Sequence, residues 1–303
     1  MRKTRRAGAD ISSIRPGSKV VREQAMAYLF LAPVLILLLL TKYIPIVMGL
    51  FISFFDIDIV NLPGDFVAFD NYLRAFKDPY FYKAMWHNVK FLLYGLCLTF
   101  WPPIIVAMFI NEQTRGKTFF RLMYYLPAVA SGIAVTVIWK YFWQPDFGLA
   151  NYLLSLIGQE PKMWLNDPSL VYLCFKLPGL LICGGMNMLT YLAAMQNVDP
   201  ALYEAAIMEG AGFWTRVRKI TIPNIKGVVG ILFLFELMNA FNMMDLVMTN
   251  GGPVRTTETM ILYAYNQAMN YNDYSYAIAM ANIVFFIILI LTAVKTKYEK
   301  NDD

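Results

Sequence analysis

Residues that commonly carry catalytic chemistry are scarce in this chain of 303 residues. Its single histidine, His87, has no second histidine with which to form a His-rich metal site and no partner for a catalytic triad. The sequence RGKT at 115–118 resembles the end of a phosphate-binding loop, but that loop requires a glycine where Asn111 stands. We therefore predict neither a catalytic nor a metal site, and we interpret His87 as a polar residue at a membrane interface.

Polar residues inside apolar stretches are better candidates for a function. Glu236 lies near the middle of an apolar run, and further polar residues follow it at intervals of three. A charged side chain at the centre of a membrane costs roughly 2.5–3.5 kcal/mol, so its presence requires a reason. Hydrogen bonding between helices is one reason, and contact with a substrate is the other. The residues that we predict to line a substrate pathway are Glu236, Asn239, Phe241, Asn242, Met186 and Asn187, with Asp245, Thr190 and Tyr191 near them.

The composition indicates a membrane protein. Hydrophobic residues make up 58% of the chain and charged residues 16%, with a mean hydropathy of +0.48. A soluble domain has about 25% charged residues. The three cysteines lack a CxxC spacing, so we interpret them as small packing residues. The Lys and Arg residues that give the net charge of +5 are concentrated in alternate loops, as in membrane proteins. We therefore predict no nucleic-acid partner.

A helix that spans a membrane needs about 20 apolar residues, and the sequence has six such stretches. They lie at about Ala25–Leu50, Met85–Ile110, Phe119–Phe142, Leu170–Met195, Gly227–Met248 and Tyr276–Val294. Prolines recur inside them, where they kink helices and free carbonyl groups. Residues 69–76, between the first two stretches, predict a short amphipathic helix. The fold class predicted from these patterns is an all-α integral membrane protein with six transmembrane helices.

The positions of Lys and Arg predict the orientation of the chain. Alternate loops and both tails carry seven, three, four and three of them, whereas the other three loops carry five in total. Cytoplasmic loops are enriched in Lys and Arg, so both termini and the loop 198–225 are expected in the cytoplasm. The predicted organisation is a basic tail at 1–24, a six-helix transmembrane domain at 25–297 and a short tail at 298–303. Lys90, Lys140 and Lys176 are expected to extend toward the outer membrane surface.

The cytoplasmic loop 198–225 contains the sequence EAAIMEGAGFWTRVRKITIP from Glu204 onward. Asp199 and Pro200 are typical of a helix start, and Gly210 is typical of a helix end. A second short helix is expected over 213–220, with Pro223 separating it from the next span. A helix, a glycine elbow and a second helix suit insertion into a groove of another protein. An amphipathic helix lying on the membrane surface is the alternative.

This segment resembles the EAA loop in the permease subunits of bacterial ABC importers. The family pattern is EAA, three residues, Gly, nine residues and then Ile-x-Leu-Pro. The chain has Glu204-Ala205-Ala206, Gly210 and Ile220-Thr221-Ile222-Pro223, in which Ile222 replaces the leucine. The later stretch LVMTNGGPVRTTETMILYAYNQAM is similar to permeases of the maltose and glycerol-phosphate type. The resemblance covers about residues 25–297 and indicates the carbohydrate branch of the family.

The resemblance implies a type I importer permease whose EAA loop forms a coupling helix. By this resemblance the residues that couple to the ATPase are Glu204, Ala205, Ala206, Gly210, Ile220 and Pro223. It also implies a second permease subunit, two cytoplasmic ATPase subunits that bind ATP with Mg, and an extracytoplasmic binding protein that delivers a sugar or oligosaccharide. The chain itself would hold no cofactor and would lie in the bacterial cytoplasmic membrane, in contact with lipid. The alternative is an ion- or proton-coupled secondary transporter acting alone, which predicts acidic relays and inverted repeats.

Overall fold

The structure is a computed structural model that describes residues 18–302, except 59–60, 114, 131 and 242–254. The chain divides into two compact units, Met1–Phe51 and Ile52–Asp303. Within the described residues, three helices are long and apolar enough to cross a membrane, and six spans result if each bent helix pair counts as one. The predicted number of spans agrees with this count.

The first unit is a single interrupted helix. It consists of α1 (Ser18–Leu38), a five-residue π-helical turn η2 (Leu39–Tyr43) and α2 (Ile44–Ile52). Residues Met26–Ile52 form a candidate span of 27 residues. This span begins and ends close to the limits expected from the sequence.

The second unit begins with a small hairpin that the sequence did not predict. Strand β1 (Phe55–Asp58) pairs antiparallel with β2 (Asn61–Phe66), with Phe55 opposite Phe66. Helix α3 (Asp70–Lys77) follows and confirms the short amphipathic helix predicted over 69–76. The buried Asn71 side chain donates hydrogen bonds to the backbone oxygens of Ser53 and Phe55, both at 3.0 Å. The hairpin is therefore fixed to α3 by polar contacts near its base.

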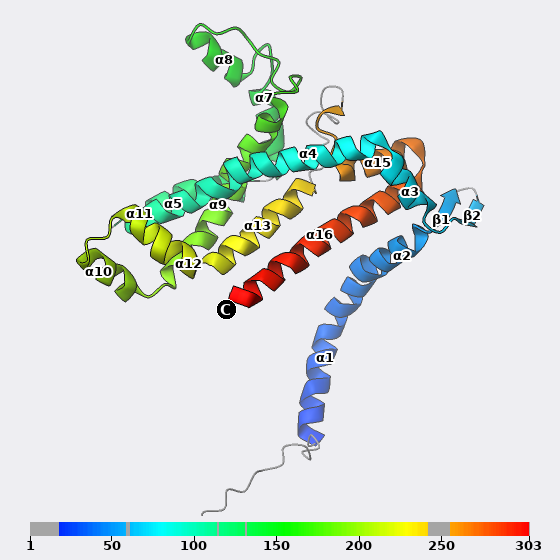
Figure 1. Ribbon diagram of the computed structural model, residues 1–303, viewed down its shortest axis with the longest axis horizontal. Helices are drawn as coiled ribbons and strands as arrows, with labels where there is room; N and C mark the ends of the chain where they lie inside the picture. The colour runs from blue at the N-terminus through cyan, green and yellow to red at the C-terminus, as the bar shows by residue number, and fades with distance from the viewer. Residues whose placement is uncertain (1–17, 59–60, 114, 131, 242–254, 303) are drawn as a thin grey trace, which may run out of the picture. The chain divides into compact units, whose positions relative to one another are not determined.

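The main bundle consists of four long helical elements. They are α4 (Pro79–Gly95) continued through η3 (Leu96–Phe100) into α5 (Trp101–Glu112), then α9 (Val171–Gln196), α13 (Lys226–Phe241) and α16 (Tyr274–Asp302). In Figure 1, α4 and α16 run in one direction and α13 runs in the other, as consecutive membrane crossings require. We call the end that carries β1, β2 and α3 the hairpin end, and the end that carries residues 198–225 the loop end.

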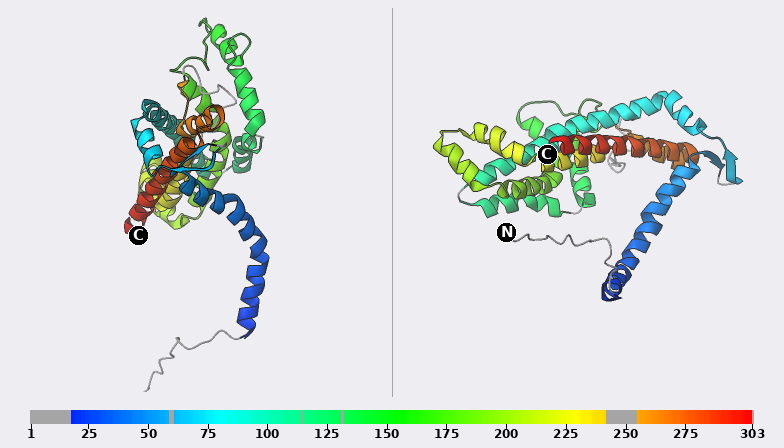
Figure 2. Two further views of the ribbon diagram at one scale, coloured as in Figure 1. Left: turned by 90° about the vertical axis from the view of Figure 1, so that its right-hand side faces the viewer. Right: turned by 60° about the horizontal axis from the view of Figure 1, so that its bottom comes forward.

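Shorter helices connect these long elements. They are α6 (Lys117–Tyr125), η4 (Leu126–Val129), α7 (Gly132–Phe142), α8 (Leu149–Leu156), α10 (Pro200–Met208), α11 (Phe213–Arg216), η5 (Val217–Thr221), α12 (Ile222–Asn224) and α15 (Met260–Tyr271). Helix α15 packs against α16 as a helical hairpin, and Figure 2 shows this pair from two further sides. The fifth predicted span reached Met248, but α13 ends at Phe241 and residues 242–254 lie outside the described part.

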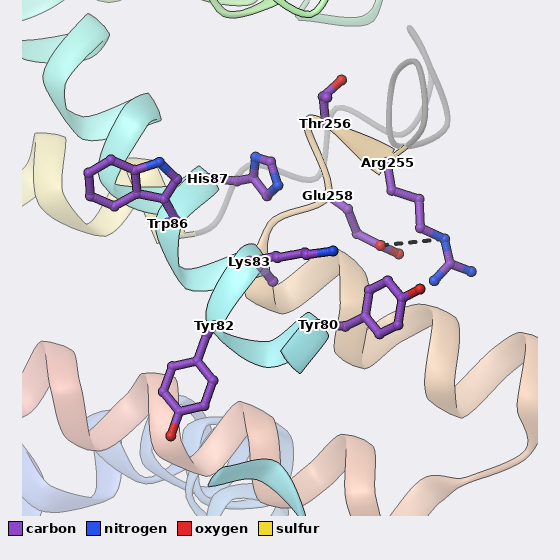
Figure 3. Close-up of a pocket in the computed structure, with 9 residues that line it drawn as sticks. Tyr80, Tyr82, Lys83, Trp86, His87, Arg255, Thr256 and Glu258 are labelled. Atoms are coloured by element: carbon purple, nitrogen blue, oxygen red, sulfur yellow. Dashed lines mark ion pairs between the residues drawn. The ribbon is translucent and has the colours of Figure 1, made fainter. Parts of the chain in front are cut away.

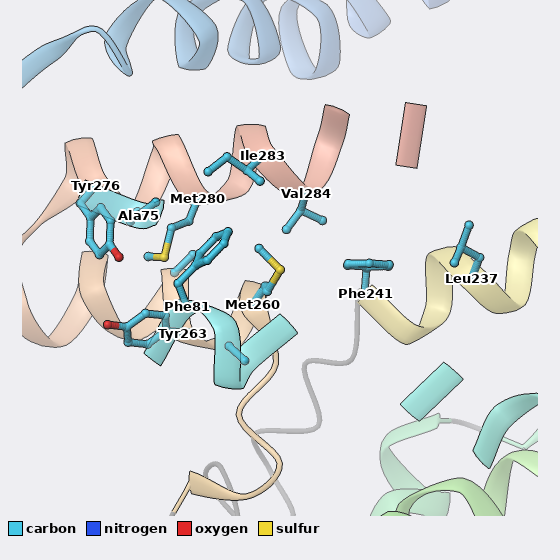
Figure 4. Packing of buried hydrophobic residues seen from close by; sticks show 13 residues of the cluster. Ala75, Phe81, Leu237, Phe241, Met260, Tyr263, Tyr276, Met280, Ile283 and Val284 are labelled. Carbon is cyan, nitrogen blue, oxygen red and sulfur yellow. The ribbon is translucent and has the colours of Figure 1, made fainter. Parts of the chain in front are cut away.

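A buried cluster at the hairpin end joins α3, α4, α13, α15 and α16. Figure 4 shows Phe81 of α4 projecting between Met260 and Met280, which lie on α15 and α16. Small side chains such as Ala75 and Ala277 are also buried there. Lipid is as apolar as leucine, so helices in a membrane associate through close packing and hydrogen bonds rather than through the hydrophobic effect. The alanines allow that close approach.

In the described residues, three π-helical turns each lie just before a proline. Turns η2, η3 and η5 each end two residues before a proline, namely Pro45, Pro102 and Pro223. A proline inside a helix lacks its N–H and its ring clashes with the carbonyl four residues earlier. A π-helical turn, whose hydrogen bonds join residues five apart, is wider than an α-helical turn and relieves this clash. The prolines therefore produce local widening, which repositions the side chains just before them.

Candidate functional site

The loop end presents the helix and elbow that the sequence predicts. The Asp199 carboxylate accepts a hydrogen bond from the Ala201 amide at 2.9 Å and caps α10. At the other end, the Gly210 amide bonds to the Ile207 carbonyl and the Ala211 amide bonds to the Ala206 carbonyl, both at 2.9 Å. These two bonds form a Schellman motif, which requires a left-handed residue. Gly210 supplies it with φ of +78°.

The surface of α10 is mixed in character. Glu204 and Ala205 are exposed, and Ala206 is half-buried. Ile207 is 54% exposed and Met208 is 87% exposed, although both are apolar. Sequence reasoning emphasised the small and acidic residues and missed this apolar tip, which the pattern IMEG directly before the elbow could have indicated. An exposed apolar tip on a rigid, capped helix is suited to docking in a groove.

Contacts with the bundle hold the loop in place. The Phe109 and Phe213 rings stack with centroids 5.6 Å apart, and Arg216 pairs with Glu112 at 3.1 Å. The Tyr203 hydroxyl contacts the Thr221 hydroxyl at 3.1 Å. These contacts join α10 to η5 and α11 to α5, so they attach the loop to the bundle. None of these six side chains was predicted from the sequence as a coupling residue.

The last two predicted coupling residues lie on the second helix of the loop. Ile220 is partly buried against the apolar cluster of α5 and α9, and Pro223 is exposed. The expectation that Pro223 separates this helix from the next span was wrong. The helical segment Phe213–Asn224 continues through Pro223, and it meets Lys226–Phe241 at a bend of 76°. The π-helical turn η5 accommodates the proline, and the break follows at Ile225.

A buried charge pair lies inside the bundle. Lys176 of α9 and Glu236 of α13 are joined at 2.8 Å, with side chains 7% and 5% exposed. The Thr99 hydroxyl of η3 lies 2.8 Å from the other Glu236 oxygen. A Cβ atom at Gly95 would lie 1.8 Å from the same carboxylate, so only glycine leaves room for it. The expectation that Lys176 extends to the membrane surface was therefore wrong, because Glu236 provides a partner for its charge within the bundle.

The predicted pathway residues are only partly brought together. Asn187 donates a hydrogen bond of 3.4 Å to the Thr99 carbonyl and thus lies beside the Glu236 cluster. Asn239 is exposed, Met186 is 54% exposed and Phe241 is buried in the apolar cluster at the hairpin end. Tyr191 is buried among apolar residues and Thr190 bonds its own helix, so neither joins the Glu236 cluster. The predicted positions Asn242 and Asp245 lie outside the described residues.

A cavity of about 830 Å³ opens at the hairpin end, and we call it the mouth cavity. The residues of its lining that carry polar groups or a tyrosine ring include Tyr80, Lys83, His87, Arg255, Thr256 and Glu258. Figure 3 shows the side chains of Tyr80, Lys83 and His87 extending from α4 toward the segment that carries Arg255 and Glu258. Trp86 extends from the other side of α4.

The walls of the mouth cavity are held by hydrogen bonds. The Tyr172 hydroxyl donates to the Thr256 carbonyl and also contacts the His87 Nδ1 atom. Glu258 accepts a hydrogen bond of 2.7 Å from Asn266 and lies 3.7 Å from Arg255. His87 is thus one part of a network between α4 and α9, which its interpretation as an isolated interfacial residue did not anticipate.

Asp78 connects the same wall to the C-terminal helices. Its carboxylate caps α4 by accepting from the Tyr80 amide at 2.8 Å. It also accepts from the hydroxyls of Tyr263 and Tyr276, at 2.6 and 2.7 Å. Burial raises the pKa of Asp78, but the three hydrogen bonds and the nearby Arg74 outweigh burial and hold that pKa below its ordinary value. The carboxylate is therefore ionised at neutral pH.

Comparison with known proteins covers most of the chain. The chain is 30% identical to the probable ABC transporter permease protein YurN of Bacillus subtilis (strain 168), over 93% of this chain and 98% of that protein. It is 28% identical to the sulfoquinovosyl glycerol transport system permease protein SmoG of Agrobacterium fabrum, over 93% and 92% of the two chains. A chain in the crystal structure of a bacterial alginate ABC transporter with its pentasaccharide-bound periplasmic protein has 24% identity, a TM-score of 0.80, and coverage of 91% and 94%.

These likenesses confirm two predictions from the sequence, the fold of an importer permease and the resemblance to ABC importer permeases. Residues 113–300 match the family described as binding-protein-dependent transport system inner membrane component. That range includes the capped helix α10, the glycine elbow and the second helix of the loop, but not α5. The chain therefore belongs to the family of inner membrane components of binding-protein-dependent transport systems.

Proposed function

We propose that this chain is the permease subunit of an ATP-driven importer that moves a sugar or oligosaccharide across the bacterial cytoplasmic membrane. The observation that carries the proposal is the loop end, where α10 is capped at both ends and presents Ile207 and Met208 to solvent. Its anchors on α5 provide a path from a docked partner into the bundle. Within the described residues, no group of three His, Cys, Asp or Glu could hold a metal ion.

The partners proposed for this chain follow from its family and from the loop. Two cytoplasmic ATPase subunits would bind ATP with Mg, and one of them would receive α10 in a surface groove. A second permease subunit would complete the translocation pathway, and an extracytoplasmic binding protein would deliver the substrate. Both termini and the loop end would face the cytoplasm because they carry most of the Lys and Arg of the loops.

The substrate proposed is a carbohydrate. Similar chains include a trehalose/maltose permease of Thermococcus litoralis, a lactose permease of Rhizobium radiobacter and an arabinooligosaccharide permease of Bacillus subtilis, each at 28–30% identity. The proposed coupling residues are Glu204, Ala205, Ala206, Gly210, Ile220 and Pro223. In the pathway, Glu236 and Asn187 remain the best-supported residues, since they meet at Thr99.

The experiment is co-purification of the tagged full-length chain from its native membranes in mild detergent, with wild type beside Glu204→Lys. We expect the wild type to recover an ATPase and a second permease. The charge reversal on the exposed face of α10 should reduce ATPase recovery while the permease partner is retained. Arg115→Glu, an exposed charge reversal outside α10, is the matched control.

Recovery of the wild type without an ATPase, at good yield, would contradict the proposal. Sugar uptake by the purified chain alone in proteoliposomes, driven by an ion gradient and independent of ATP, would instead support a secondary transporter.

A further inference from the structure

Lys83 lines the mouth cavity, and the described residues provide no carboxylate partner for its charge. The Glu258 carboxylate forms an ion pair with Arg255 and accepts a hydrogen bond from Asn266. Within the part of the chain that the structure describes, Lys83 forms no ion pair, and its Nζ lies 5.0 Å from the centre of the Tyr80 ring. An ammonium group carries three hydrogen-bond donors and no acceptor. Lys83 therefore offers donors to a ligand in the cavity.

The hydrogen bonds of His87 fix which of its nitrogen atoms is free. The Thr256 carbonyl can only accept, so the Tyr172 hydroxyl uses its single proton for that contact. His87 Nδ1 must then donate to the Tyr172 oxygen. In a neutral imidazole with a protonated Nδ1, Nε2 is an acceptor. His87 thus contributes an acceptor to a cavity in which Lys83 contributes donors.

The third element is the Tyr80 ring, whose centre lies 5.0 Å from Lys83 Nζ and 5.9 Å from Arg255 Cζ. Tyr80 is 50% exposed, lines the cavity and is followed by Lys83 one helical turn later. An aromatic ring beside polar groups suits a ligand with an apolar face and a polar rim. A sugar ring has both, because its C–H groups lie on its faces and its hydroxyls lie around its edge.

We propose that the mouth cavity is a receiving site for a neutral sugar unit, with the Tyr80 ring against its C–H face, Lys83 donating to a hydroxyl oxygen and His87 Nε2 accepting from a hydroxyl. Each sugar hydroxyl both donates and accepts, which matches this set. A carboxylate or phosphate ester would meet an unfavourable acceptor at Nε2. The volume of about 830 Å³ lies within the range of small-molecule sites. The proposal rests on the proposed function and adds the location and class of the first sugar contact.

The test uses the fact that His87 is the only histidine of the chain. Diethyl pyrocarbonate acylates a free imidazole nitrogen, and peptide mapping by mass spectrometry follows the adduct on His87 separately from adducts on lysines and tyrosines. The full-length chain with its co-purified partners is modified in the presence of trehalose, maltose, lactose or sn-glycerol 3-phosphate. We expect at least one neutral sugar to slow the modification and sn-glycerol 3-phosphate to have no effect.

Two variants connect the protection to the cavity. In Lys83→Gln, the concentration of sugar that gives half-maximal protection should rise about ten-fold, since a hydrogen bond from a charged donor is lost. Lys77→Gln removes an exposed lysine of α3 outside the cavity lining and should leave protection unchanged. Gel filtration of each variant checks that the assembly is retained.

The proposal is overturned if no neutral sugar protects His87, or if sn-glycerol 3-phosphate is the compound that protects it. Equal protection in Lys83→Gln and wild type also overturns it. ATP-dependent uptake of the same sugars into proteoliposomes is measured in parallel and tests the proposed function. Uptake without protection rejects the receiving site alone, whereas protection without uptake supports the site and rejects the import function.

Discussion

Lys176 and Glu236 connect three spans through a single charge pair. Glu236 lies on α13, Lys176 on α9 and Thr99 on η3. The side chains of Lys176 and Glu236 are only 7% and 5% exposed. Replacing a buried pair with apolar residues is often tolerated, whereas removal of one partner leaves an uncompensated charge. The position Gly95 shows how closely the backbone is fitted to this pair, because any side chain there meets the carboxylate.

We expect Lys176→Met to destabilise the folded chain by about 3–5 kcal/mol, because Glu236 then remains buried without its partner. The double variant Lys176→Met/Glu236→Met should recover most of this loss. Lys140→Met, which removes an exposed lysine of α7, is the control and should have little effect. Denaturant unfolding in detergent measures all four proteins. A double variant as unstable as the single one would show that the charges do not act as a pair.

The pH dependence of stability should report on Asp78. A carboxyl whose pKa is lowered on folding stabilises the folded state above its unfolded pKa, and this contribution is lost as the pH falls through the folded pKa. The Asp78 pKa lies below its ordinary 3.8. We therefore expect the melting temperature of wild type to exceed that of Asp78→Asn by a constant amount between pH 5 and 8. This difference should decrease below about pH 4. Thermal melts in detergent measure both melting temperatures, and a difference that changes between pH 5 and 8 would contradict the prediction.

At the scale of the element, the helices of this chain are shaped by their prolines and glycines. Three π-helical turns precede Pro45, Pro102 and Pro223, and η3 places Thr99 against Glu236. The elbow after α10 depends on a different property of the backbone. Nothing lies within 4 Å of a Cβ atom at Gly210, so the need for glycine there comes from its positive φ rather than from crowding.

We expect Gly210→Val to reduce coupled transport. A residue with a side chain in the left-handed conformation costs about 1–2 kcal/mol, which corresponds to roughly a five- to thirty-fold change in an equilibrium. Gly212→Val is the matched control, since Gly212 has φ of −67° and open space around it. Recovery of the ATPase and sugar uptake should fall for the first variant only, at equal membrane abundance. Normal coupling in Gly210→Val would show that α10 does not need the elbow.

At the scale of the whole molecule, the two ends of the second unit differ in kind. The loop end carries a rigid helical projection with an apolar tip, and the hairpin end carries a cavity lined by polar and aromatic groups. A permease must receive substrate at one membrane surface and energy at the other. The described helices therefore place a helical projection at one end and a cavity at the other, as this family is expected to do.

The orientation of these ends can be measured by labelling. After the ATPase subunits have been stripped from the membranes, we expect Met208→Cys to react with a membrane-impermeant maleimide in inside-out vesicles, and Lys77→Cys to react in right-side-out vesicles. Both positions are exposed, and they lie at the loop end and on α3. The wild type, with its own three cysteines, gives the background. Reaction of both variants from the same side would contradict the predicted topology.

The sequence by itself determined the features that depend on local pattern. Runs of apolar residues predicted the spans because each must match the membrane thickness. Asp199, Pro200 and Gly210 predicted α10 and its elbow because caps depend on residues adjacent in the chain. The family resemblance also came from such a local motif, and the comparisons confirmed it.

Only the tertiary structure decided which polar groups meet. Lys176 and Glu236 lie 60 residues apart, and His87 and Tyr172 lie 85 apart. No local period connects such positions, so Lys176 was wrongly expected at the membrane surface. The mouth cavity likewise forms from α4 and the segment before α15, which are distant in sequence. The physical reason is that a buried charge or hydroxyl is satisfied by whichever helix packs beside it, and that choice is made by the fold of the whole bundle.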